Sequence, residues 1–479
     1  TKDTQGFYLK EIVGTELRNV TAMRYGGQIG DDTYYRVWGK YTDHDSFGPT
    51  GDDHNFDDWR IGHSGFRVDH EGVEDTTVTL QGEAFYSDQM GEQFSIPNSM
   101  PFSTTRVRGD NRGEGGHLLT RVKRRHPGGS GWSVTGYVDY FGFKSLDDHE
   151  VDLLTTSLDW RHHLDIGDRQ NFIWGAGYRL HYYETEPGAS VAFDPPRDEM
   201  HLFSAFAQDT ITLEPDRWFF MLGSKFEHND RSGFEIQPSA RLWWTPDDRQ
   251  TVWGSVSRAV RRPSPADEDL NLTLMRTASP PPNDEVEIRG SDIDAENVMA
   301  YEMGYRNRLS EEVTFDTAAF LNIYDDLVVL EQRGEDLVIV NGGEAESYGL
   351  ETSVRWRPAS NLSLTGSYSL LLIHAHGPMT DDIEDLAPTH QFHARSDYDV
   401  TDNVALHGAL YFVDDVGNVP PYWRLDTGIT WRVNENVDLS LWGQNLLDNR
   451  HPEFESSASA SPDATEVERG AYLQLRCRF

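Results

Sequence analysis

The last eleven residues of the chain, 469–479, alternate between apolar and polar side chains. The apolar residues share one face of an extended segment: Ala471, Leu473, Leu475, Cys477 and Phe479. The intervening residues carry polar groups: Tyr472, Gln474, Arg476 and Arg478. This period of two predicts a β-strand that runs to the carboxyl terminus. A strand with one apolar and one charged face suits a wall between lipid and water.

Similar segments recur along the whole chain, about twenty-two in all, from 6–14 to 469–479. From the second segment onward, every other connection is tight and rich in Gly, Pro, Asn and Asp, as hairpin turns are. The intervening connections are often long and acidic: 42–58, 87–115, 184–200, 262–297, 331–346, 375–390 and 448–468. Short turns on one side and long loops on the other are typical of an outer-membrane barrel.

We therefore predict an all-β fold, a transmembrane antiparallel β-barrel of about 22 strands that occupies residues 6–479. Its turns would be short and periplasmic, and its loops long, acidic and extracellular. An even strand number places both termini on the turn side, and the segment 6–14 would pair with 469–479 to close the barrel. Aromatic residues near strand ends, such as Tyr34, Tyr35, Trp38, Tyr182 and Tyr183, would form the interfacial belts.

Composition narrows the class of protein. Hydrophobic residues make up only 37% of the chain and the mean hydropathy is −0.62, and no apolar run reaches the ~20 residues of a membrane helix. Barrel strands remain possible because they are apolar only at every second residue. The net charge of −38 excludes binding to nucleic acid through phosphate. The acidic excess indicates either a solvated surface, as in a saline habitat, or attraction of cations to a pore mouth.

Five stretches resemble the TonB-dependent outer-membrane receptors, in order along the chain: SRAVRRPS (257–264), AYEMGYR (300–306), NGGEAESYGLE (341–351), VPPYWRLD (419–426) and GQNLLDNRH (443–451). The resemblance implies a 22-stranded barrel in the outer membrane of a Gram-negative bacterium, surrounded by lipid and lipopolysaccharide, with an N-terminal plug inside it. It also implies import of a scarce ligand such as an iron–siderophore complex or cobalamin. Neither the resemblance nor any GxSxG or triad spacing indicates an enzyme.

The sequence departs from that family at its start. Residues 1–5 are interpreted as a remnant that leads in from a plug, and neither a plug nor a Ton box is present. The alternative function is therefore a plugless barrel that acts as a passive pore or as a sheath around a partner protein. A plug or other lumen-filling partner could be a separate chain, and contact with TonB would depend on that missing plug.

Candidate ligand-binding residues lie toward the extracellular side: Arg258, Arg261, Arg262, His374 and His376. The arginines would either meet an anionic chelate or pair with carboxylates of the plug or wall. Candidate metal ligands lie in two loops: Asp43, His44, Asp45, Asp52, Asp53, His54, Asp381 and Asp382. Carboxylates at this density suit Ca²⁺, and His with carboxylate suits iron or zinc, although solvated loop charge is the alternative. No cofactor is required, and the bound species would be Ca²⁺ or an iron chelate.

Overall fold

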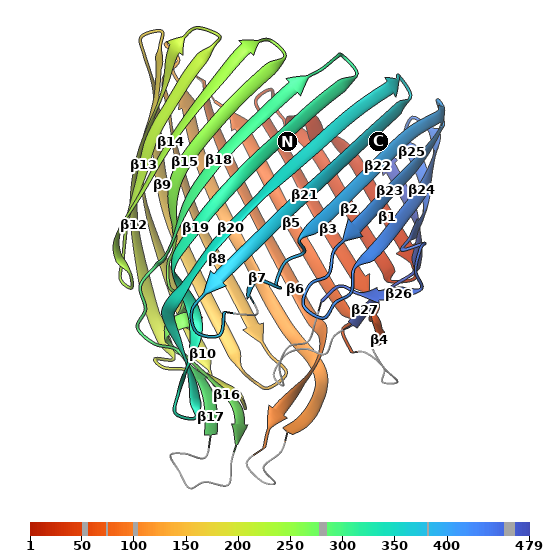
Figure 1. Cartoon of the computed structure of the whole chain (residues 1–479). Helices are drawn as coiled ribbons and strands as arrows, with labels where there is room; N and C mark the ends of the chain where they lie inside the picture. The colour runs from red at the N-terminus through yellow and green to blue at the C-terminus, as the bar shows by residue number, and fades with distance from the viewer. Residues whose placement is uncertain (50–55, 73–74, 99–103, 277–284, 381–382, 455–464) are drawn as a thin grey trace.

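The computed structural model describes residues 1–49, 56–72, 75–98, 104–276, 285–380, 383–454 and 465–479. These residues form one tall, closed barrel (Figure 1). None of the helices in the described ranges is long or apolar enough to span a bilayer. The predicted all-β barrel is confirmed.

Twenty-two strands build the wall within the described residues. In chain order they are β1 (Gly6–Gly14), β2 (Leu17–Ile29), β3 (Thr33–His44), β5 (Trp59–Glu71), β6 (Thr76–Pro97), β7 (Thr104–Arg125), β8 (Gly131–Lys144), β9 (Glu150–Ile166), β10 (Gln170–Glu186), β12 (Arg197–Glu214), β13 (Trp218–Asn229), β14 (Gly233–Asp247), β15 (Gln250–Arg261), β18 (Glu296–Arg308), β19 (Val313–Arg333), β20 (Asp336–Ala359), β21 (Leu362–His376), β22 (His390–Thr401), β23 (Val404–Val413), β24 (Tyr422–Asn434), β25 (Val437–Gln444) and β28 (Gly470–Arg478).

The first and last strands close the wall. Each strand is antiparallel to the wall strands beside it, and β1 pairs with β28 from Tyr8↔Arg478 to Gly14↔Tyr472. Both termini lie at the end of the barrel that carries the tight turns, opposite the long loops (Figure 1). This arrangement confirms the predicted closure and the predicted polarity of the loops.

The two faces of the wall follow the alternation in the sequence. Leu441 on β25 and Leu473 on β28 are cross-strand neighbours, and their side chains are 54% and 48% exposed on the outer face. One position along, Ser440 and Gln474 are neighbours on the inner face, where Ser440 shares a hydrogen bond of 2.9 Å with Thr430. The apolar stripe of each strand therefore faces lipid, and the polar stripe faces the lumen.

Smaller elements lie beyond the wall on the loop side. The strands β4 (Gly48–Pro49), β26 (Arg450–Pro452) and β27 (Thr465–Glu468) form a separate small sheet. The strands β11 (Val191–Phe193), β16 (Leu270–Arg276) and β17 (Glu285–Arg289) extend the main sheet outward. A 3₁₀ turn, η1 (Lys2–Thr4), precedes β1, and a single turn of helix, α1 (Pro265–Glu268), begins the longest loop.

Two connections predicted as long loops are largely strand. β6 continues to Pro97 and β7 begins at Thr104, while β19 continues to Arg333 and β20 begins at Asp336. Register shifts interrupt both hairpins, between Ser87 and Met90 and between Tyr324 and Leu327. A bulge moves the alternation out of phase, so the sequence pattern looks like a loop although the hydrogen-bonded ladder goes on.

The aromatic belts exist, but adjacent aromatic residues are divided between the two faces. On the turn side, Trp160 packs edge-on against Trp174 at 4.5 Å between ring centroids, and Trp218 stacks on Trp244 at 5.5 Å. Of the residues predicted for the belts, Tyr35 and Tyr182 share the outer face with apolar neighbours. Their neighbours Tyr34, Trp38 and Tyr183 take the opposite, inner face, because successive side chains of a strand point in opposite directions.

Candidate ligand pocket at the extracellular mouth

Arg258 and Arg261 both pair with carboxylates of the wall or loop. The ladder between β14 and β15 ends at Ser239↔Ser257, and the Arg258 guanidinium bridges the strands beyond that point. It donates to the backbone oxygen of Ile236 and to the side chains of Asn297 and Glu235, the last at 3.2 Å. Arg261 pairs with Glu296, its cross-strand partner on β18, and at 3.0 Å with Asp267. Their charges are therefore compensated inside the protein.

A capped helical turn holds the start of the longest loop against the mouth. Ser264 is the N-cap of α1, Pro265 fixes the first helical position, and Asp267 completes a capping box by accepting from the Ser264 backbone N–H at 2.8 Å. Burial raises the pKa of the Asp267 carboxyl, but hydrogen bonds from Ser264 and Arg261 outweigh it and leave the pKa below its usual range. The stabilisation that Asp267 gives is therefore present above the ordinary carboxyl pKa and is lost as the pH falls through its depressed value.

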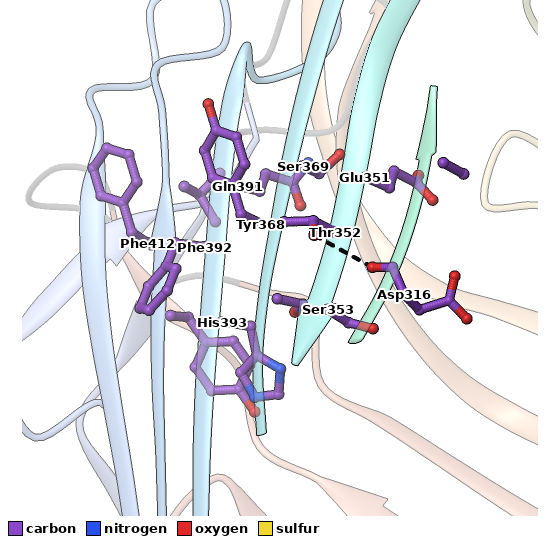
Figure 2. Close-up of a pocket in the computed structure, with 14 residues that line it drawn as sticks. Asp316, Glu351, Thr352, Ser353, Tyr368, Ser369, Gln391, Phe392, His393 and Phe412 are labelled. Atoms are coloured by element: carbon purple, nitrogen blue, oxygen red, sulfur yellow. Dashed lines mark hydrogen bonds between the residues drawn. The ribbon is translucent and has the colours of Figure 1, made fainter. Parts of the chain in front are cut away.

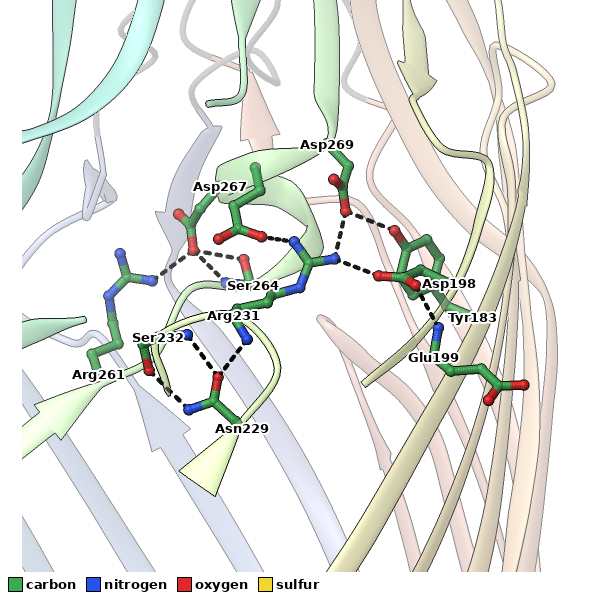
Figure 3. A network of polar contacts seen from close by, with 11 residues as sticks. Tyr183, Asp198, Glu199, Asn229, Arg231, Ser232, Arg261, Ser264, Asp267 and Asp269 are labelled. Carbon is green, nitrogen blue, oxygen red and sulfur yellow. Dashed lines mark hydrogen bonds and ion pairs between the residues drawn. The ribbon is translucent and has the colours of Figure 1, made fainter. Parts of the chain in front are cut away.

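A second anchor comes from the turn between β13 and β14. The Arg231 side chain is only 10% exposed and contacts three carboxylates: Glu268, Asp269 at 2.7 Å and Asp198 at 3.0 Å (Figure 3). The Tyr183 hydroxyl donates to the same Asp269 carboxylate at 2.7 Å. Burial opposes the charge of Arg231, but Asp269 and the other acidic neighbours raise its pKa above the usual value. This network ties the longest loop to β10, β12 and the β13–β14 turn.

The anchored loop covers one side of a pocket of about 650 Å³ at the extracellular end of the wall. Its lining is largely apolar or aromatic and includes Leu153, Phe193, Met200, Leu202, Val260 and Pro263. His181 and Arg262 add polar groups, and the Thr155 hydroxyl lies 2.9 Å from Nδ1 of His181. Across the described part of the chain, the Arg262 side chain has no hydrogen-bond or ion-pair partner. Of the three candidate arginines, Arg262 alone thus keeps a guanidinium available to a ligand.

The two candidate histidines lie on the other side of the wall. His374 belongs to the outward set of β21, and its Nε2 lies 3.2 Å from the Tyr348 hydroxyl of the outward set of β20. His376 is two positions further along β21, opposite Glu344. Neither histidine lines the mouth pocket, so the structure does not bring them together with Arg262.

The candidate metal residues that the structure describes engage other partners. Asp43 pairs with Arg60 at 3.3 Å, Asp45 pairs with Arg18, and His44 stacks on Trp59 at 5.6 Å between centroids. Asp52, Asp53, His54, Asp381 and Asp382 lie outside the described residues. Among the described His, Cys, Asp and Glu residues, no group of three or more is placed to hold a metal ion.

A second hollow, of about 450 Å³, lies in the wall between β19 and β23. Its lining includes Ser353, Ser367 and Tyr411. Figure 2 shows Ser353 between His393 and Asp316, which also line the hollow. His393 and Tyr411 stack at 4.5 Å with an interplanar angle of 11°.

Sequence reasoning missed Arg231, Tyr183 and Asp198 as mouth residues. Arg231 stands in a short turn, and its partners Asp198 and Asp269 are 33 and 38 residues away. The alternation of connections along the chain assigned residues 230–232 to the loop side of the barrel, but no local feature of the sequence marked Arg231.

The fold and this mouth were compared with known proteins. Residues 10–446 match the family model described as TonB dependent receptor-like, beta-barrel. A mutant of the ferric enterobactin receptor of Pseudomonas aeruginosa superposes with a TM-score of 0.78 at 16% identity, over 99% of this chain and 80% of that one. The siderophore receptor PirA of Acinetobacter baumannii gives a TM-score of 0.78 at 14% identity, over 99% and 81%. At such identities the structures show a shared fold, and the family model covers most of the sequence. This chain therefore belongs to the TonB-dependent receptor β-barrel family.

Proposed function

We propose that this barrel takes up an anionic iron–siderophore complex, which it first binds in the pocket at its extracellular mouth. The observation that carries the proposal is the Arg262 guanidinium, which forms no hydrogen bond or ion pair with the described residues and borders a largely apolar and aromatic pocket. The structural relatives support the ligand class, since they include a ferric enterobactin receptor and siderophore receptors.

The chemistry of the pocket favours a flat or aromatic anion over a neutral polar solute. Apolar walls such as Leu153, Phe193 and Met200 gain by covering the hydrocarbon part of a ligand. A guanidinium next to them can donate two parallel hydrogen bonds to a carboxylate, catecholate or hydroxamate oxygen pair. Arg258 and Arg261 cannot compete for the anion because their charges are already paired.

We also propose that uptake is coupled to energy through a lumen domain and TonB. Membership of the family supports this, because the family is defined as TonB-dependent. Uptake that persists unchanged in cells without TonB would contradict the coupling and would favour a passive pore.

Binding and transport test the proposal directly. The protein would be expressed in a Gram-negative host that lacks its own siderophore receptors, and iron-limited growth and ⁵⁵Fe uptake would be measured with ferric catecholates, ferric hydroxamates and cobalamin. We expect uptake of at least one ferric chelate. Arg262→Ala should weaken binding of that chelate to the purified protein by about 10- to 100-fold, the equivalent of a charge-assisted hydrogen bond worth about 1.5–3 kcal/mol.

Arg217→Ala is the matched control, since Arg217 is an exposed arginine in a turn on the other side of the membrane. It should leave chelate binding and uptake unchanged. If Arg262→Ala bound the chelate as tightly as the wild type, Arg262 would not be part of the binding site. Uptake of cobalamin with no uptake of any ferric chelate would refute the ligand class.

A further inference from the structure

A third hollow, of about 230 Å³, lies in the inner face of the wall next to the mouth pocket. Leu202 and Arg262 border both cavities, so the hollow continues the mouth pocket along the wall. Its other charged lining residues come from β9, β10 and β13. The volume is below the roughly 300–1,000 Å³ of pockets for drug-sized ligands, so it suits a small ion or one arm of a larger ligand.

The register of four strands makes room for this hollow. Asp159, Gly177, Ser204 and Glu227 are neighbours on one inward rung that crosses β9, β10, β12 and β13. Gly177 is the narrow point of that rung, because a Cβ added there would lie 2.6 Å from Oδ1 of Asp159 and 2.9 Å from Oγ of Ser204. A larger residue at position 177 would therefore intrude into the hollow.

Three arginines reach the hollow from different segments of the chain. Arg179 lies two positions from Gly177 toward the extracellular end of β10, and Arg161 lies two positions from Asp159 toward the turn end of β9. Arg262 follows the end of β15. None of the three arginines forms a hydrogen bond or an ion pair with the described residues. The Nε–H group of Arg179 is also buried, so solvent does not reach it.

The charges around the hollow are not balanced. Four cations and two carboxylates border it: Arg161, Arg179, Lys225, Arg262, Asp159 and Glu227. Lys225 pairs with Glu227 at 2.8 Å, and Asp159 accepts a hydrogen bond of 2.9 Å from the Ser157 hydroxyl. The three arginines therefore leave an excess of positive charge, which a bound anion would neutralise.

Arginines without partners also occur elsewhere on the inner face. Among the described residues, Arg36 of β3 and Arg355 of β20 point inward and form no hydrogen bond or ion pair either, but neither borders the hollow. An unpaired guanidinium alone therefore does not define a site. What the hollow adds is the convergence of three guanidinium groups on one small cavity beside the mouth pocket.

We propose that this hollow is a subsite for a small group with paired anionic oxygens, of the phosphate or carboxylate class. The inference rests on the proposed function and deepens it, since Arg262 would be shared between the chelate in the mouth pocket and the anionic group beside it. Each planar guanidinium can donate two parallel hydrogen bonds to such an oxygen pair. The group could come from a free inorganic oxyanion or from a pendant carboxylate of the chelate.

Inorganic phosphate is the probe for a free oxyanion. Its binding to the purified protein in detergent would be measured by isothermal titration calorimetry at 50 mM NaCl, and we expect a Kd of about 1 mM or below. The double variant Arg161→Gln with Arg179→Gln should bind phosphate at least tenfold more weakly. Gly177→Val should weaken binding as well, because it fills the hollow without a change of charge.

The matched control is the double variant Arg36→Gln with Arg355→Gln. It removes the same charge from two inward arginines that also lack partners among the described residues but lie outside the hollow. The control should bind phosphate like the wild type. Equal losses in the two double variants would overturn the proposal, because they would show a general attraction of anions to the lumen and no particular site.

Two chelates distinguish the sources of the anionic group: ferric citrate, which carries free carboxylates, and ferrioxamine B, a hydroxamate chelate without them. If a pendant carboxylate occupies the hollow, Arg161→Gln with Arg179→Gln should weaken binding of ferric citrate at least tenfold and leave binding of ferrioxamine B unchanged. If a free oxyanion occupies it, the same variant should lose phosphate and bind ferric citrate like the wild type.

The proposal is overturned if the wild type binds neither phosphate nor ferric citrate, or if Arg161→Gln with Arg179→Gln binds both like the wild type. Phosphate binding needs no chelate, and the contribution of Arg262 to chelate binding is measured separately with Arg262→Ala. Failure of the subsite and failure of the proposed function are therefore distinguishable.

Discussion

At the scale of single residues, the direction of each side chain decides its role. Tyr182 and Tyr183 are neighbours, but the outward Tyr182 faces lipid while the inward Tyr183 donates to Asp269 in the mouth network. The same alternation of side chains places His374 on the outer face of the wall, away from the side chains that point into the lumen. A residue's chemistry therefore follows from its position in the alternation as much as from its type.

The outer face gives a prediction for Leu475. This residue lies in mid-strand on β28, with the apolar Leu439 as its neighbour on β25. Leu475→Arg places a charge against lipid and should destabilise the barrel by about 2–4 kcal/mol. The measurement is reversible unfolding in phospholipid vesicles by urea or guanidinium.

Gln474→Arg is the matched control, because Gln474 is the adjacent inward residue of the same strand. It should change the unfolding free energy by less than about 1 kcal/mol, since surface charges next to water cost little. Equal destabilisation by both substitutions would show that the two faces of β28 are assigned the wrong way round.

At the scale of elements, the extracellular mouth depends on contacts between a loop and several strands. α1 has only four residues and cannot persist alone, since isolated helices this short are unstable in water. Its position comes from its capping box, from Arg261 and from the buried Arg231. These contacts also shape the pocket that contains Arg262.

Arg231 is therefore the residue whose loss should release the loop. Arg231→Ala leaves Glu268, Asp269 and Asp198 close together without their cation, so the carboxylates repel one another. We expect proteolysis in 262–276 to be at least tenfold faster, with an unchanged barrel circular dichroism spectrum. Lys225→Ala, at another cation that pairs with a buried carboxylate, is the control and should leave that cleavage rate unchanged. An unchanged rate in Arg231→Ala would mean that α1 and Arg261 suffice to hold the loop.

At the scale of the whole molecule, the chain is an outer-membrane barrel of a Gram-negative bacterium. Its family and its structural neighbours are receptors and transporters rather than enzymes. The net charge of −38 belongs to the whole chain, whereas Lys10, Arg24, Arg36 and Lys40 place four cations on the inner face of β1, β2 and β3. An ion that passes through the lumen would therefore be affected both by the acidic excess of the chain and by these inward cations.

When the lumen is open, the acidic exterior should make the conductance cation-selective at low salt. The preference, measured as a reversal potential in planar bilayers, should weaken between 0.1 M and 1 M KCl because the Debye length falls from about 10 Å to about 3 Å. Neutralising the inward cations Lys10, Arg24, Arg36 and Lys40 should strengthen the preference for cations. Anion selectivity in the wild type would show that the lumen cations outweigh the exterior.

The sequence alone determined the fold, the loop polarity and the closure of β1 on β28, because alternation and turn residues act over a few neighbouring positions. It could not decide which arginines remain available to a partner. Arg258 finds Glu235 and Asn297 at separations of 23 and 39 residues, and Arg231 finds Asp269 at 38, across strands that only the closed wall brings together. Arg262 follows the end of β15 and forms no hydrogen bond or ion pair with the described residues. Lys10 lies opposite Ala22 and Arg476, neither of which is a carboxylate. The short-range sequence pattern specifies the barrel, and the register of its strands decides which charged side chains find partners.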